Sequence, residues 1–128
     1  MSRFTRITAL TASGVLLAVP VAMIATPAHA DVERYGSCGG GQYDFSVDRE
    51  NRGYEVSVDL DNVEPGSRWK VVMRHDGDRF FKRTLTADNE GDLDVDRRRG
   101  NTSGKDTFTF RAVRADGSAS CGRAITVR

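Results

Sequence analysis

The sequence predicts an all-β fold, an antiparallel two-sheet sandwich of about seven strands, on three observations. Apolar and polar residues alternate with period two along most of the chain beyond residue 41, as they do in strands with one buried and one solvated face. Turn-forming pairs, Pro65-Gly66, Asp76-Gly77 and Asp116-Gly117, interrupt this alternation at short intervals. No amphipathic helix pattern occurs after residue 30. Many short strands joined by tight turns in one small domain favour a sandwich.

Residues 1–30 have the pattern of a bacterial-type export signal. Arg3 and Arg6 precede an almost entirely apolar stretch, and the small residues Ala28 and Ala30 follow it. A signal peptidase reads this small-x-small pattern. We therefore expect cleavage after Ala30 and a secreted, extracellular protein, with an uncleaved membrane anchor as the alternative.

The mature chain is predicted to begin with a flexible segment and to continue as the sandwich. Residues 31–41 end in the glycine run Gly39–Gly41, which we interpret as a loose lead-in to the sandwich over residues 42–128. The strands are predicted, in chain order, around residues 42–47, 54–60, 69–74, 79–86, 92–96, 107–112 and 121–127. Their inward positions are Tyr43, Phe45 and Val47; Tyr54, Val56, Val58 and Leu60; Trp69, Val71 and Met73; Phe81 and Leu85; Leu93 and Val95; Phe108, Phe110 and Ala112; Cys121, Ile125 and Val127.

The connections between these strands are predicted from turn-forming and polar residues. In chain order they are 48–53, Pro65-Gly66, Asp76-Gly77, 87–91, 97–105 and Asp116-Gly117. The segment 97–105 is the longest polar loop of this prediction.

Cys38 and Cys121 are the two cysteines of the chain, and an exported protein meets an oxidising compartment. With two cysteines only one intramolecular pairing exists, so we predict a structural disulfide between them. Two free thiols or an intermolecular bridge are the alternatives. No Cys-x-x-Cys spacing indicates redox catalysis.

Trp69 in the third predicted strand and Thr107–Ala112 in the sixth resemble the corresponding strands of immunoglobulin-like and fibronectin-type sandwiches. This resemblance implies an immunoglobulin-like strand arrangement. The cysteines depart from it, because an immunoglobulin domain joins its second and sixth strands. The whole chain, through Gly104–Asp106 and Cys121-Gly122, also resembles small secreted proteins of high-GC Gram-positive bacteria, a group without an assigned activity. That resemblance implies no site.

The charge balance limits the partners that we expect. The chain has 19 basic and 18 acidic residues, and the two basic residues of the export signal are lost on cleavage. A nearly neutral mature chain favours neither nucleic acid nor a membrane surface as partner. We expect a monomer whose partner is an extracellular protein or a glycan.

His75 is the one histidine beyond the export signal, and we interpret it as a solvated turn residue beside Asp76-Gly77. No sequence motif of a hydrolase accompanies it, so we expect no catalytic residue and no enzymatic activity. Cys38, His75 and Cys121 lack the spacing of zinc ligands. We therefore expect no metal and no cofactor.

Acidic residues recur at every second position before the longest loop. They are Asp88, Glu90, Asp92, Asp94 and Asp96. Weak calcium binding is one interpretation, since Ca²⁺ takes several carboxylate oxygens. The favoured interpretation is an exposed strand face whose charges prevent pairing at a sheet edge.

The function expected from these patterns is a secreted, non-catalytic binding module that uses loops at one end of the sandwich. The candidate partner-binding loop contains Arg97, Arg98, Arg99, Asn101 and Lys105, because arginine suits bidentate contacts with anionic groups. A secreted protease inhibitor that presents Arg97–Gly104 is one alternative. A small-ligand carrier with a cleft between the sheets is another.

Overall fold

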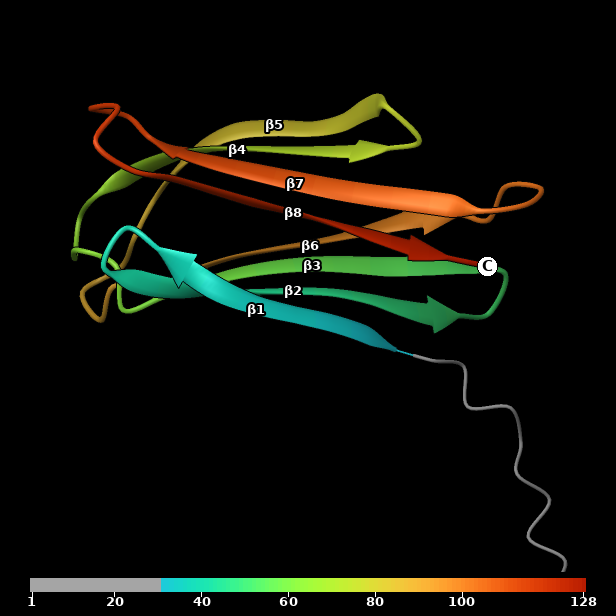
Figure 1. Cartoon of the computed structure of the whole chain (residues 1–128). Helices are drawn as coiled ribbons and strands as arrows, with labels where there is room; N and C mark the ends of the chain where they lie inside the picture. The colour runs from blue at the N-terminus through green and yellow to red at the C-terminus, as the bar shows by residue number, and fades with distance from the viewer. Residues whose placement is uncertain (1–30) are drawn as a thin grey trace, which may run out of the picture.

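The computed structural model describes residues 31–128, which form two antiparallel four-stranded sheets packed face to face (Figure 1). Sheet 1 has the strand order β1-β2-β3-β6, and sheet 2 has the order β5-β4-β7-β8. The strands are β1 (Val32–Cys38), β2 (Gly41–Glu50), β3 (Gly53–Asp61), β4 (Arg68–His75), β5 (Asp78–Thr86), β6 (Leu93–Gly100), β7 (Asp106–Arg114) and β8 (Ser120–Val127). The predicted all-β sandwich is confirmed, with eight strands instead of seven. The predicted export signal lies outside the described residues.

The additional strand is β1, so the expectation of a flexible segment over residues 31–41 is wrong. β1 pairs with β2 along its whole length, from Val32 opposite Val47 to Cys38 opposite Gly41. The sequence gives little sign of it because the inward positions between Val32 and Cys38 hold arginine and glycine, not apolar residues. An edge strand of this kind is held mainly by backbone hydrogen bonds to one neighbour.

The core lies between the two sheets and contains the aromatic residues expected there. Trp69, Phe45 and Phe108 are fully buried, and Tyr43 and Tyr54 are almost so. The indole nitrogen of Trp69 donates a hydrogen bond of 2.9 Å to Ser67 Oγ, which satisfies the one polar group that the ring carries into the core. Apolar burial of this kind is the dominant favourable contribution to folding.

The predicted disulfide between Cys38 and Cys121 is confirmed, with a Cα–Cα distance of 5.3 Å. Cys38 ends β1 and does not precede the first strand as expected, whereas Cys121 lies in β8. β1 and β8 are edge strands of different sheets. The bridge therefore joins the two sheets along one side of the sandwich, where no ladder of backbone hydrogen bonds connects them.

The opposite side of the sandwich, between β5 and β6, is covered by arginine side chains. β6 continues to Gly100 in register with β3, so the predicted loop 97–105 is wrong in its first part. Arg97 and Arg99 occupy the inward phase, and their guanidinium groups lie 4.7 Å from the ring centres of Phe81 and Phe80. At these inward positions arginine stems and cation–π contacts cover the aromatic rings, where a strand would ordinarily have apolar residues. The end of β6 therefore lacks the alternation of apolar and polar residues by which a strand is predicted.

Among residues 31–128 no helix is long and apolar enough to cross a membrane.

Removal of the disulfide should strongly destabilise the domain. The bridge closes a loop with a sequence separation of 83 residues, and a loop of this length corresponds to about 4 kcal/mol on the chain-entropy model. We expect the Cys38→Ala/Cys121→Ala double variant to lose free energy of unfolding of this order, measured by urea denaturation. Wild-type protein under reducing conditions is the control and should match the variant. Equal stability of oxidised protein and variant would contradict the assignment.

Candidate functional site

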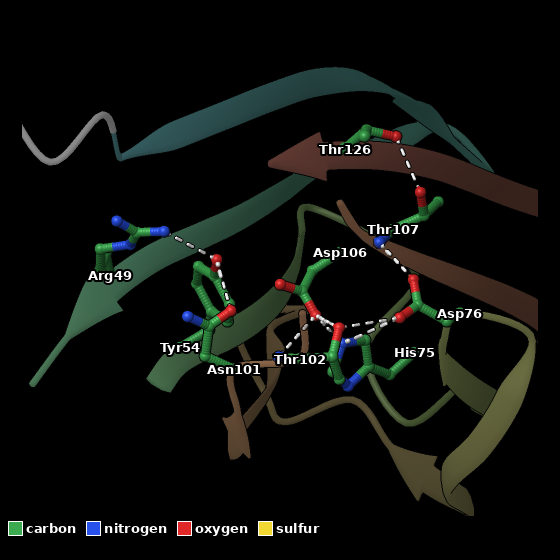
Figure 2. A network of polar contacts seen from close by, with 9 residues as sticks. All are labelled: Arg49, Tyr54, His75, Asp76, Asn101, Thr102, Asp106, Thr107 and Thr126. Atoms are coloured by element: carbon green, nitrogen blue, oxygen red, sulfur yellow. Dashed lines mark hydrogen bonds and ion pairs between the residues drawn. The ribbon is translucent and has the colours of Figure 1, made fainter. Parts of the chain in front are cut away.

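His75 is buried, and the expectation of a solvated turn histidine is wrong. Its exposed fraction is 5%, and its Nε2 atom lies 2.6 Å from Asp106 Oδ1 (Figure 2). The His75 ring stacks on Phe108 at a centroid distance of 4.2 Å. β4 ends on its inward phase, since Trp69, Val71, Met73 and His75 are all buried positions of the same strand. The turn that the sequence indicated begins one residue later.

Asp106 is the centre of this polar cluster. It is fully buried, and its Oδ1 atom accepts hydrogen bonds from the Thr102 hydroxyl at 2.6 Å and the Thr102 amide at 3.3 Å, besides its contact with His75. Burial raises the pKa of the Asp106 carboxyl, but the hydrogen bonds from Thr102 and His75 outweigh it and the pKa is lowered. The ionised carboxylate thus fastens the β6–β7 loop to the end of β4.

Asp76 completes the cluster from the β4–β5 turn. Its Oδ1 atom accepts a hydrogen bond of 2.7 Å from the Thr107 amide, and its Oδ2 atom lies 3.6 Å from His75 Nε2. One ligand atom each from His75, Asp76 and Asp106 lies within 4.8 Å of the other two, the geometry of a possible metal site. Asp106 Oδ1 accepts three hydrogen bonds within the protein, whereas its buried Oδ2 atom has no hydrogen-bond partner. We interpret the cluster as a structural clamp, because the contacts of Oδ1 and of Asp76 join three segments of the chain.

A second branch of polar contacts lies beside the clamp at the same end of the sandwich (Figure 2). The Tyr54 hydroxyl accepts a hydrogen bond of 3.1 Å from Arg49 and donates one of 3.4 Å to Asn101 Oδ1. Arg49 also donates to the carbonyl of Arg128. Asn101, a candidate partner-binding residue, therefore takes part in holding the loop.

The clamp should stabilise the fold in a pH-dependent manner. Since the pKa of Asp106 is lowered in the folded state, its contribution is complete above the ordinary carboxyl pKa and is lost as the pH falls through the lowered value. We expect Asp106→Asn to lower the free energy of unfolding at pH 7 by about 3 kcal/mol, with a smaller difference below about pH 4.

Chemical denaturation across this pH range would measure the effect of Asp106→Asn. Asp78→Asn is the matched control, because it removes an exposed carboxylate beyond the same turn and should change stability by less than about 0.5 kcal/mol. Equal and pH-independent effects of the two substitutions would contradict the clamp.

The structure does not bring the five candidate loop residues to one place. Arg97 and Arg99 cover the β5–β6 side. Arg98 points to the outer face of sheet 1, where it forms an ion pair of 2.9 Å with Glu50. Lys105 is exposed in the short loop before β7. Successive residues of a strand alternate between faces, so Arg98 cannot contact the same anion as Arg97 and Arg99.

The outer face of sheet 1 is strongly acidic. Asp44 of β2, Asp59 of β3 and Asp94 of β6 lie directly opposite one another in register, which forms a row of carboxylates across three strands. The outward acidic residues of this sheet are Glu33, Asp44, Asp48, Glu50, Glu55, Asp59, Asp61, Asp94 and Asp96. Arg98 is the one outward basic residue among these register positions. We call this surface the acidic face.

Part of the acidic stretch 88–96 contributes to this face. Asp94 and Asp96 are exposed and alternate with buried Leu93 and Val95, as the interpretation of an exposed strand face expected. Asp88 has a different role, because its Oδ1 atom accepts hydrogen bonds from the backbone amides of residues 90 and 92. These bonds shape the β5–β6 turn.

Burial and, after it, the neighbouring carboxylates of Asp61, Asp44 and Asp94 raise the pKa of Asp59 to about 6. Burial and neighbouring carboxylates also raise the pKa of Asp44 and of Asp61. Carboxylates opposite one another on a sheet repel. The acidic face therefore costs stability at neutral pH.

Relief of this repulsion is testable at Asp59. Its folded pKa of about 6 exceeds the ordinary value of 3.8, so the cost is complete above pH 6 and disappears as the pH falls toward 4. We expect Asp59→Asn to be more stable than wild type at pH 7 by up to about 1 kcal/mol, allowing for solvent screening, and equal to it at pH 4. Asp116→Asn, which removes a carboxylate beside Arg114, is the control and should show no gain. A loss of stability at pH 7 in Asp59→Asn would contradict the assignment.

The outer face of sheet 2 carries the opposite charge. Its outward basic residues are Arg68, Lys70, Arg74, Arg79, Lys82 and Arg111. The outward positions of β4, β7 and β8 between them contain no acidic residue. We call this surface the basic face. The nearly neutral charge of residues 31–128 thus divides into two oppositely charged surfaces.

A groove of about 700 Å³ crosses β4, β7 and β8 on the basic face. Lys70, Arg74, Arg111 and Arg123 line it, together with small or polar residues that include Thr109, Ser120 and Gly122. None of the four cations forms an ion pair within residues 31–128, where the pairs involve His75, Arg98 and Arg114. The groove therefore presents cations without an ion pair on a concave surface.

Sequence reasoning missed the groove, although part of the signal was present. Lys70, Arg74 and Arg111 occupy polar positions of strands that the alternation predicted. The order of the strands within a sheet is not visible in that alternation. Only the pairing of β4 with β7 places Arg111 beside Val72, between Lys70 and Arg74.

Comparisons of the chain with protein-family models, with curated proteins and with solved structures found no match.

Proposed function

We propose that this protein is a secreted, non-catalytic binding module whose basic face captures a linear anionic polymer bearing phosphate or sulfate groups. The observation that carries the proposal is a groove lined by three outward-facing cations without an ion pair, Lys70, Arg74 and Arg111. Arg123, on the inward phase of the edge strand β8, adds a fourth cation to its lining. Unpaired cations in a concave surface attract an anion without first breaking an internal ion pair. Arginine in particular binds phosphate and sulfate oxygens in a bidentate manner.

The spacing of the cations favours a polymer over a single small anion. Lys70 and Arg74 are separated by four residues of one strand, a distance of about 13 Å in extended backbone. Arg111 lies on the neighbouring strand between them. A chain of repeating anionic groups would contact all three side chains at once, whereas one phosphate would contact one or two.

The groove replaces the 97–105 segment as the favoured binding surface. Arg97 and Arg99 are engaged with aromatic rings, and Arg98 with Glu50. A protease inhibitor that presents Arg97–Gly104 is correspondingly disfavoured, because residues up to Gly100 are hydrogen-bonded to β3 and not free to enter an enzyme cleft.

We further infer an immunoglobulin-like strand arrangement. The orders β2-β3-β6 and β5-β4-β7-β8 agree with A-B-E and C′-C-F-G of immunoglobulin-like sandwiches, with β1 as an added edge strand. In this arrangement the proposed ligand binds to a sheet face and not to the loops at either end. The rigid ladder of β4, β7 and β8 would hold the cations at fixed spacing.

Neutralisation of the groove should weaken polyanion binding and its dependence on salt. We expect Lys70→Gln/Arg111→Gln to bind immobilised heparin or polyphosphate at least about tenfold more weakly than wild type, and to lower the slope of log affinity against log salt by about 2. Preference for heparin indicates a sulfated ligand, and preference for polyphosphate indicates a phosphate polymer.

The control is Arg98→Gln/Lys105→Gln, which makes the same change in net charge within the segment 97–105. It should bind both probes as wild type does. Equal weakening of polyanion binding in the two double variants would show that net charge alone determines the affinity. That result would contradict the groove as the binding site. Failure of wild type to bind either probe at low salt would contradict the proposed function itself.

A further inference from the structure

We infer that copies of this protein associate face to face, with the acidic face of one copy on the basic face of the next. Both surfaces belong to the same chain and lie on opposite sides of the sandwich. The acidic face presents the row Asp44, Asp59 and Asp94. The basic face presents Lys70 and Arg111, with no outward acidic residue on β4, β7 or β8.

Tyr35 provides an observation that does not depend on charge. It is 64% exposed and is the exposed large apolar side chain of the described residues. It lies on β1 directly opposite Asp44, so it extends the carboxylate row by one strand. Tyrosine and arginine are enriched at the centres of protein interfaces, and an aromatic ring packs well on a guanidinium group.

The groove on the basic face suits this tyrosine. Its lining combines Arg111 and Arg74 with small or half-buried residues, Val72, Ser120 and Gly122 among them. A protruding ring from a second copy would fill part of the groove beside the arginines, while the carboxylates next to it face Lys70. The acidic row and the groove therefore complement each other in charge.

A second copy accounts for both faces at once, which is why we favour it over an unrelated basic partner. Charge complementarity also explains how the acidic face persists despite the raised carboxyl pKa values that it produces. Contact with cations of another copy would relieve the repulsion among Asp44, Asp59 and Asp94.

The expected association is weak and open-ended. A face of four strands, each about eight residues long, covers about 500 Å², so a contact buries roughly 1,000 Å² in total, the lower end of specific interfaces. The two surfaces in contact are different, so the contact is heterologous and each added copy leaves one face of each kind free. Exposed charge pairs are screened by salt, so association should be strongest at low ionic strength.

This inference shares the groove with the proposed function but does not require it to be correct. A polyanion in the groove would displace the acidic face of the neighbouring copy. The two ideas predict different effects of a change on sheet 1, which contributes to self-association but not to polyanion capture.

The test uses two charge-reversal variants of the mature chain and their mixture. Asp59→Lys/Asp94→Lys places two cations in the carboxylate row of the acidic face, and Lys70→Glu/Arg111→Glu places two carboxylates in the groove of the basic face. By sedimentation at low salt, wild type should show a weight-average mass that rises with concentration, whereas each variant alone should remain monomeric. An equimolar mixture should associate again, since the unaltered basic face of one variant meets the unaltered acidic face of the other.

Several outcomes would overturn the inference. Wild type that stays monomeric at millimolar concentration and low salt would do so, as would a mixture no heavier than its components. Thermal melting establishes that each variant is folded. The salt dependence is measured on wild type alone, whose association should weaken by roughly tenfold or more on moving from low to high salt.

Tyr35→Ala should weaken self-association without changing the stability of the fold. An unchanged mass distribution in this variant would contradict the place of Tyr35 in the contact.

Polyanion binding distinguishes the failure of this inference from that of the proposed function. Asp59→Lys/Asp94→Lys retains the groove and should still bind heparin or polyphosphate. Capture of polyanion by a wild-type protein that never self-associates would leave the proposed function intact and would reject the face-to-face association. Self-association without polyanion capture would reject the proposed function and leave this inference intact.

Discussion

Burial of one face of each sheet against the other is the constraint on which the rest of this structure depends. Side chains of paired strands alternate strictly between two faces, so a slip of one residue would carry charge into the core. Because Phe45, Val58 and Val95 face inward, their sequence neighbours Asp44, Asp59 and Asp94 face outward. The apolar core thus sorts the charges, and the pairing order of the strands then decides which charges become neighbours.

Contacts of a different kind stabilise each side of the sandwich where the two sheets are not joined by backbone hydrogen bonds. The Cys38–Cys121 bridge joins the sheets along the β1–β8 side. Arg97 and Arg99 cover aromatic rings along the β5–β6 side, where charge also discourages pairing with another chain. At one end the ionised carboxylate of Asp106 holds the β6–β7 loop on β4. One oxygen of this buried carboxylate accepts hydrogen bonds within the cluster, which offset part of the cost of its burial.

The sequence supported the fold class, the buried aromatic residues and the disulfide, because alternation and cysteine count are local signals. It failed at β1 and at the end of β6, where arginine and glycine occupy inward positions of edge strands. It also failed at His75, whose partner Asp106 is 31 residues away along the chain. The groove required knowledge that β4 and β7 are neighbours, a long-range pairing that no local pattern contains.

The position of the disulfide has a mechanical consequence. The bridge joins β1 to β8 with a sequence separation of 83 residues, so a pulling force applied to the chain on either side of the two cysteines passes through the covalent sulfur–sulfur link. Only the parts of β1 and β8 outside the bridge would be peeled away under load. The core strands β2 to β7 lie within the covalent loop and carry no tension, so the oxidised domain would tolerate stretching that unravels the reduced one.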